Sequence, residues 1–198
     1  NCPFGAIADK SQIFQLIRAL RRGDDIIAEV APSYVGQFGD NMTPGKFKAA
    51  LKEMGFSAVY EVALGADIGA ATEAEHYAER VATGQQPYMF TSCCPSWAML
   101  IKRYFPETAD KLSNTLTIKQ AHPDSRVVFI GPCAAKKLEA SRRTVRSDVD
   151  FVITFEELSA MFEAKGIDLD TFDKSEELDD ATGAGRGYAV AGGVAGAI

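Results

Sequence analysis

The sequence has 198 residues, of which 46% are hydrophobic and 24% are charged, a balance typical of a soluble globular protein that can bury a substantial core. The net charge of −6, without a basic stripe, argues against nucleic-acid binding, and no apolar run is long enough to span a membrane. The start does not read as a signal peptide, and four cysteines, two of them adjacent, do not form a secreted disulfide framework, which favours the reducing cytoplasm.

Apolar periodicity and capping residues predict helices that alternate with strands in the first half of the chain. Ser11 is the expected N-cap of the first helix and Gly23 its stop, while Thr43 caps a second helix that has Pro44 at its first position. The expected elements are a helix over 12–22, a strand over 25–32, a helix over 44–54, a strand over 57–64 and a helix over 71–83.

The second half of the chain continues this alternation. The expected elements are a strand over 87–92, a helix over 96–105, strands over 126–133 and 150–155, and a helix over 156–165 that Gly166 ends. Strands that alternate with helices in this way predict an α/β fold with parallel strands.

Three of the predicted strands end in segments of unusual composition, at 31–33, 91–94 and 131–133. Ligands of parallel α/β sheets bind beyond the carboxyl ends of the strands, so we expect these segments to converge on one edge. Two of them carry cysteine, whose thiolate is a natural metal ligand. Cys93 and Cys94 are adjacent, so they are awkward as a disulfide and point in different directions, which indicates two thiols with different roles.

The first residues, "NCPFGAI", fit the end of the bacterial ferredoxin pattern C-x2-C-x2-C-x3-C-P, in which Cys2 would bind a [4Fe–4S] cluster. The alternative is a chance Cys-Pro pair at the terminus, and the three partner cysteines are absent from this chain. The sequence also stops inside the apolar segment "GYAVAGGVAGAI". We therefore expect a fragment of a longer protein.

The segment "GPCAAKKLE" places two lysines one turn beyond a cysteine that follows a strand. A lysine in this position, Lys136, can lower the pKa of the Cys133 thiol and donate hydrogen bonds to an anionic ligand. The alternative is a structural cysteine with two solvated lysines. A zinc site is the generic alternative for the thiols, but the spacing does not favour it, since there is no C-x-x-C and the only histidines are His76 and His122.

Together, "TSCCPSW" and "PCAAKKLE" resemble the first two H-cluster motifs of the [FeFe]-hydrogenases. The resemblance extends to "EVAPSYVGQFG", "GADIGAATEAEHYAER", "SDVDFVITFEEL" and "GAGRGYAVAGGV", and so covers most of the chain. It implies the two-lobed iron-only hydrogenase catalytic domain, with parallel sheets flanked by helices and incomplete at the C-terminus. Residues 1–25 would be the end of a ferredoxin-like [4Fe–4S] module with a linking helix, and 26–198 the N-terminal part of the H-cluster domain.

The resemblance also implies a metal centre, the H-cluster, in which a [4Fe–4S] cubane shares a cysteine sulfur with a diiron subsite carrying CO, cyanide and a bridging dithiolate. Cys94 and Cys133 match two of the four cubane ligands, and the other two belong to a third motif that this chain lacks. Cys93 matches the free thiol that passes protons between the dithiolate and the protein. Cys2 would bind an additional [4Fe–4S] cluster with upstream cysteines.

A proton path is implied in the same way. Glu73 matches the first glutamate of the family's path, Ser113 its serine and Arg80 its outer arginine. His76 replaces the second glutamate, and because imidazole titrates closer to neutrality, the path is either kept with a different pH dependence or broken. Taken alone, Glu73 and His76 would be ordinary solvated residues of a helix face.

Residues beside the diiron subsite are implied too. Lys136 matches the lysine that hydrogen-bonds a cyanide ligand, and Ala31, Pro32 and Ser33 match the segment that lines the dithiolate. Gly131 stands where the best-studied enzymes have methionine, which we expect to open space near the subsite. Together with Ser96, where glycine is common, this departure is similar to the group B branch of the family.

The function implied is reversible conversion of protons and electrons to H2, with electrons from ferredoxin or another redox partner and with maturation proteins that supply the cofactor. The fragment by itself is expected to be inactive. Two alternatives stay open: an H2-sensing H-cluster protein, which the retained Cys93 disfavours, and a hydrogenase-like iron–sulfur assembly adaptor, which Lys136 disfavours because it would have no cyanide to bind.

Overall fold

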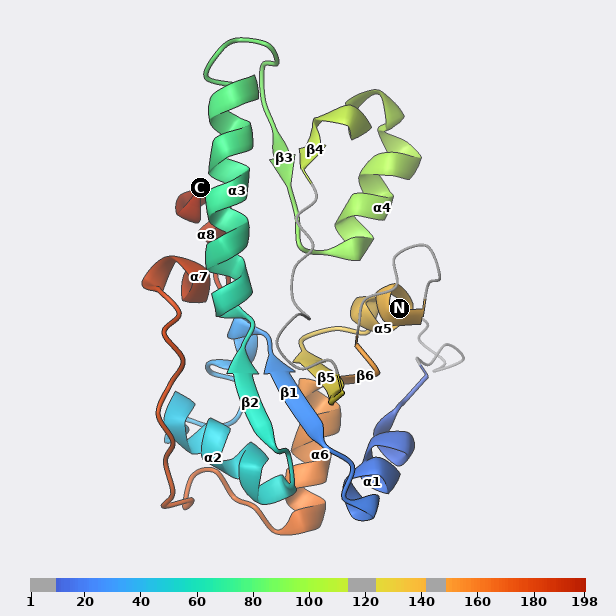
Figure 1. The fold of residues 1–198 in the computed structure, drawn as a ribbon, viewed down its shortest axis with the longest axis vertical. Coiled ribbons are helices and arrows are strands. Elements are labelled where there is room, and N and C mark those ends of the chain that lie inside the picture. The colour runs from blue at the N-terminus through green and yellow to red at the C-terminus, as the bar shows by residue number, and fades with distance from the viewer. Residues whose placement is uncertain (1–9, 114–123, 142–148) are drawn as a thin grey trace.

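A four-stranded parallel sheet forms the centre of the protein in a computed structural model, which describes residues 10–113, 124–141 and 149–198 (Figure 1). The strand order is β2-β1-β5-β6, and every neighbouring pair is parallel, which confirms the predicted α/β class. These strands are β1 (Ile26–Val30), β2 (Ala58–Glu61), β5 (Arg126–Gly131) and β6 (Phe151–Thr154).

Helices connect the strands and cover the sheet. In the described part of the chain they are α1 (Ile13–Arg22), α2 (Pro44–Met54), α3 (Ala63–Arg80), α4 (Pro95–Tyr104), α5 (Ala135–Ser141), α6 (Phe155–Lys165), α7 (Gly183–Gly187) and α8 (Gly193–Ala197), with the 3₁₀ helices η1 (Pro32–Tyr34) and η2 (Pro106–Lys111). Helices α1, α2 and α6 share one hydrophobic core with the sheet, in which Leu16, Phe47 and Leu158 are fully or almost fully buried. Burying one such side chain stabilises the fold by about 1.5–3 kcal/mol.

The ends of three helices show how closely local signals fix the structure. Thr43 caps α2 through its side chain, and Gly55 ends that helix with φ of 115°, a left-handed conformation that glycine adopts at low cost. Gly166 ends α6 in the same way, as predicted. The N-cap of α1 is Gln12 rather than the predicted Ser11, whose hydroxyl oxygen accepts the Ile13 N–H at 3.3 Å.

Two predicted strands are shorter than their sequence pattern suggested. β2 stops at Glu61, which pairs with Val30, the last residue of β1, so the chain has no further partner there and α3 begins at Ala63 instead of in the region of Ala71. The strand that precedes the adjacent cysteines, β3 (Phe90–Thr91), is only two residues long and pairs with β4 (Leu112–Ser113) in a separate small sheet. The segment over 91–94 therefore does not follow a strand of the central sheet, whereas those over 31–33 and 131–133 do.

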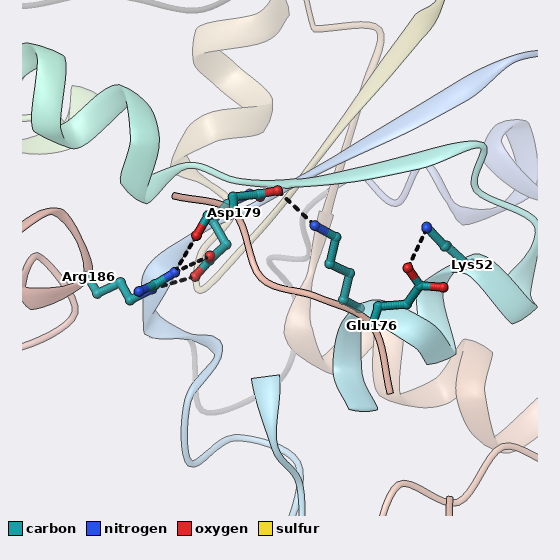
Figure 2. Close-up of polar contacts among 6 residues, drawn as sticks. Lys52, Glu176, Asp179 and Arg186 are labelled. Carbon is teal, nitrogen blue, oxygen red and sulfur yellow. Dashed lines mark hydrogen bonds and ion pairs between the residues drawn. The ribbon is translucent and has the colours of Figure 1, made fainter. Parts of the chain in front are cut away.

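The segment after α6 returns across the molecule along α2 and β2 and places α7 against α3 (Figure 1). Ion pairs fasten it at several points, and Figure 2 shows Lys52 with Glu176 at 2.7 Å. Farther along the segment, Asp179 pairs with Lys48 at 2.7 Å. Arg186 then makes a two-pronged pair with Glu61, at 3.0 and 2.7 Å.

No helix among the described residues is long and apolar enough to cross a membrane.

Candidate functional site

The two central strands of the sheet, β1 and β5, end beside each other at the point where the strand order reverses. β1 is flanked by β2 and β5 is flanked by β6, so the connections that follow these two strands lead to opposite sides. Such a switch point is where open α/β sheets form ligand crevices. Ala31, just after β1, donates its N–H to the Ile130 carbonyl at 2.9 Å, so residues 31–33 lie at the same edge as Pro132 and Cys133.

The adjacent cysteines lie between β3 and α4. Ser92 fixes their backbone, because its hydroxyl oxygen accepts the Cys94 N–H at 2.9 Å. Cys94 is the N-cap of α4 and Pro95 occupies the first turn, where a missing N–H costs nothing. Cys93 lies one residue before the N-cap.

Lys136 joins the two cysteine motifs. Its Nζ atom donates to the Cys93 carbonyl oxygen at 3.1 Å and pairs with Glu139 at 2.6 Å. Lys136 lies in the first turn of α5, three residues after Cys133. Its contact with Cys93 therefore places the segment that follows β5 beside the segment that follows β3. The predicted convergence of these segments thus comes from a side-chain contact and not from a shared sheet.

The second lysine of the motif has a different structural role. Lys137 pairs with Glu157 at 2.9 Å, and both side chains are largely buried. Glu157 also closes the capping box of α6, accepting the Thr154 N–H at 2.8 Å. The two lysines therefore have different roles. Lys136 contacts the cysteine segment, and Lys137 forms an ion pair that connects α5 to α6.

Glu73 is the buried acid nearest to the cysteine segment. It is only 4% exposed, and Thr91, two residues before Cys93, donates a short hydrogen bond to its carboxylate. Thr91 also pairs in β-register with Ser113, which places the backbone of Ser113 beside this contact, although the Ser113 side chain lies outside the described part of the structure. Sequence reasoning gave Thr91 no role, although its hydroxyl group, two residues before Cys93, could have indicated a hydrogen-bonding residue.

The remaining path residues continue along α3. Glu73, His76 and Arg80 are three and four residues apart, which places them along one side of the helix. His76 and Arg80 are only partly buried, so the row leads from the buried carboxylate towards solvent.

Cys93 has an environment that keeps its thiol protonated. Although its side chain is exposed, desolvation by the surrounding protein atoms raises its pKa, the negative charge of Glu73 acts in the same direction, and the Lys136 ammonium opposes both. Tyr188, a residue that sequence reasoning missed, lies close enough to Glu73 and Cys93 that their charges, with burial as the main cause, raise the pKa of its phenol. Asp67 holds this region in place, because its carboxylate accepts the Thr182 N–H at 2.7 Å and the Gly185 N–H at 2.9 Å.

The expectation that Gly131 opens space was wrong. A Cβ atom added to Gly131 would lie 2.4 Å from Cε1 of Phe129, so the aromatic ring already occupies the place of a side chain. Residues two apart on a strand share a face, which explains why this ring can lean over the glycine.

The thiols have the chemistry of iron–sulfur ligands. Cys93, Cys94 and Cys133 are all free, and Cys94 and Cys133 follow two different strands. Among the residues that the structure describes, no three His, Cys, Asp or Glu side chains are grouped so as to hold a metal ion. Cys94 and Cys133 are the thiols that the resemblance assigns to the cubane, and Cys2 lies outside the described residues.

These features define an α/β protein in which Lys136 joins two cysteine segments, one after β3 and one after β5. The chain matches the family model "Iron only hydrogenase large subunit, C-terminal domain" over residues 24–198. It therefore belongs to that family, as its motifs indicated.

Known relatives agree with this assignment. The chain is 30% identical over 223 residues to iron hydrogenase 1 of Clostridium pasteurianum, covering 97% of this chain and 39% of that protein. Its structure superposes on a variant of an [FeFe]-hydrogenase from Chlamydomonas reinhardtii with a TM-score of 0.72 and 25% identity, covering 90% of this chain and 53% of the other. It is also 28% identical over 134 residues to the cytosolic Fe-S cluster assembly factor NAR1 of Meyerozyma guilliermondii, which is 57% of this chain and 25% of that protein. The chain thus spans about half or less of the length of these proteins.

Proposed function

We propose that this chain is the part of an [FeFe]-hydrogenase catalytic domain that supplies two cubane thiolates, the surroundings of the diiron subsite and the inner end of a proton path. The reaction is the reversible conversion of protons and electrons to H2. The observation that carries the proposal is the 3.1 Å contact of Lys136 Nζ with the Cys93 carbonyl, because it brings the two cysteine motifs together in space.

The H-cluster, when bound, supplies the metal centre at which protons are reduced and H2 is cleaved. Cys94 and Cys133 would hold its cubane, together with two thiolates from outside the described residues. Lys136 would donate a hydrogen bond to a cyanide ligand, since its ammonium already lies at the junction of both cysteine segments. Residues 31–33 would line the dithiolate from the end of β1.

The protein's own residues move the proton. The Cys93 thiol holds it, because desolvation and the charge of Glu73 keep this group in the protonated form. Glu73 exchanges it with Cys93 from its buried position on α3. Ser113, His76 and Arg80 would carry it onward to solvent, with the imidazole of His76 in place of a carboxyl group.

The wider assignment follows from the same resemblance. Residues 1–25 would end a ferredoxin-like module in which Cys2 binds a [4Fe–4S] cluster, and 26–198 would begin the H-cluster domain. Electrons would come through that module from a ferredoxin or another redox partner, and maturation proteins would deliver the diiron unit. The three free thiols suit a reducing compartment, which supports a cytoplasmic location.

A second candidate function is that of an iron–sulfur assembly factor, which the similarity to NAR1 supports. An H2-sensing H-cluster protein is the third. Retention of Cys93 and Lys136 favours the hydrogenase, since an assembly factor without cyanide ligands has no need of a lysine at this position.

The deciding experiment is an infrared spectrum in the CO and cyanide stretching region. The complete gene product that contains this chain is prepared without oxygen and loaded with the diiron cofactor. Bands from bound CO and cyanide, together with H2 turnover that Cys93→Ala abolishes, support the hydrogenase. Bound bands with negligible turnover support the sensor. Absence of the bands while [4Fe–4S] absorption is intact favours the assembly factor and overturns the proposal.

A further inference from the structure

Phe129 and Gly131 form a complementary pair on β5. Both face the side of the sheet opposite to Val128 and Ile130, because side chains alternate along a strand. The space above Gly131 is filled by the Phe129 ring, whose Cε1, Cζ and Cδ1 atoms would lie 2.4, 3.1 and 3.4 Å from a Cβ at that position. Any larger residue at 131 would therefore displace the ring.

The exposed side of this ring carries Lys136. The Nζ atom lies 5.6 Å from the centre of the Phe129 ring, within the range of a cation–π interaction. The same ammonium makes the contacts to the Cys93 carbonyl and to Glu139. Gly131 leaves room for the ring, and the ring in turn contacts the Lys136 side chain that joins the two cysteine motifs.

We propose that Phe129 is a positioning residue of this site: its ring, seated over Gly131, holds the Lys136 ammonium in the orientation that faces the Cys93 segment and the cofactor. The role toward the cofactor rests on the proposed function, whereas the pairing of Phe129 with Gly131 does not. Phe129 would act only through Lys136.

The competing explanation is that Phe129 is an ordinary core residue, since it also packs against the hydrophobic core. Under that explanation the ring would still fill the space above Gly131, but truncating it would have no more effect on the site than truncating any other core ring.

The first test measures stability and needs no cofactor. Urea unfolding is followed for the wild type, Gly131→Ala, Phe129→Leu and the double variant. Gly131→Ala should lower the folding equilibrium constant about tenfold or more, as overpacking of a tight site does. Leucine lacks the two ring atoms closest to Gly131, so in the Phe129→Leu background the same change should cost less than about threefold. Equal costs in both backgrounds would overturn the pairing.

The second test asks about Lys136 directly. In the cofactor-loaded complete protein, Phe129→Leu should shift or broaden a cyanide stretching band, because Lys136 loses its support. Phe56→Leu is the matched control, since Phe56 is a buried core ring that has no part in the site. Its cyanide bands should stay at the wild-type positions.

The outcomes separate the two proposals. If the wild type shows no cyanide band, the proposed function fails, while the stability cycle still decides whether Phe129 and Gly131 are coupled. If the wild type shows the bands and Phe129→Leu leaves them as unchanged as Phe56→Leu does, the positioning role is overturned.

Discussion

The ammonium of Lys136 and the backbone carbonyl of Cys93 lie 3.1 Å apart, although 43 residues separate them in the sequence. Lys137, the next residue, points instead to Glu157 on α6 at 2.9 Å. The two adjacent lysines thus contact different parts of the protein. Replacing Lys137 should affect mainly stability, and replacing Lys136 should affect mainly the site.

Replacing either lysine by methionine tests this division. Lys137→Met should lower the free energy of unfolding by about 1–3 kcal/mol, because it removes the ion-pair partner of the largely buried Glu157 carboxylate. Lys136→Met should change stability less, since its partner Glu139 lies one turn away on the same short helix, but should weaken the cyanide bands of the loaded protein. Urea unfolding and infrared spectra measure the two effects. Equal stability losses would contradict the division.

The pair of Lys137 and Glu157 should also make stability depend on pH. Burial opposes ionisation of Glu157, but the hydrogen bonds from Lys137, Ser11 and the Thr154 N–H together outweigh it and hold the pKa of Glu157 below its usual range. A carboxyl group whose pKa is depressed by folding stabilises the protein above its unfolded pKa, about 4.3, and loses that contribution as the pH falls through the folded pKa. The stability difference between the wild type and Lys137→Met should therefore be full at pH 6 and shrink steadily below about pH 4. A difference that grows towards low pH would refute this account.

Glu73 should matter for proton transfer and not for holding the cofactor. Glu73→Gln keeps a group that can accept the hydrogen bond of Thr91 but cannot exchange a proton with Cys93. H2 production by the loaded protein should fall by about 10²–10⁴-fold, the usual effect of removing a proton-transfer group, with unchanged infrared bands. Glu75→Gln, an exposed neighbour on the same helix, is the control and should retain wild-type turnover. Loss of the infrared bands in Glu73→Gln would show a structural role instead.

Arg186 should not be replaceable by lysine. Its guanidinium binds both carboxylate oxygens of Glu61, which is 8% exposed, and also donates to the Asp179 carbonyl at 2.8 Å. A lysine offers no planar fork, so Arg186→Lys should cost about 1–3 kcal/mol. The figure stays below that of a fully buried pair because the Arg186 side chain is 38% exposed and water screens it. Arg22→Lys, in an exposed pair with Asp24, is the control and should leave the urea midpoint unchanged.

Much of the architecture was predictable because its signals are local. Caps such as Thr43 and Gly55 fix the ends of α2, and buried apolar runs fix β1, β5 and β6. What failed depends on pairing between distant segments. The length of β2 depends on where β1 ends, and β3 lies outside the central sheet because it pairs with β4. The residues of β2 and β3 alone do not show either pairing.

The site shows the same division. The cysteine motifs identified Cys94, Cys133 and Lys136 as candidate site residues, since their residue types and spacing are visible in the sequence. Phe129 and Tyr188 were missed, because nothing in the sequence shows that one covers Gly131 or that the other approaches Glu73 and Cys93. Such roles arise from tertiary packing and become visible only when the chain is folded.

The ion pair of Glu61 and Arg186 also limits when this part of the protein can fold during synthesis. The two residues are 125 positions apart, so Glu61 leaves the ribosome long before its partner is made. At about 5–20 residues per second, the interval is on the order of ten seconds. During that time the edge formed by β2 and α3 has a carboxylate that cannot be buried without cost, and the nascent chain must keep it in water. Closure of this edge therefore waits for translation of residue 186.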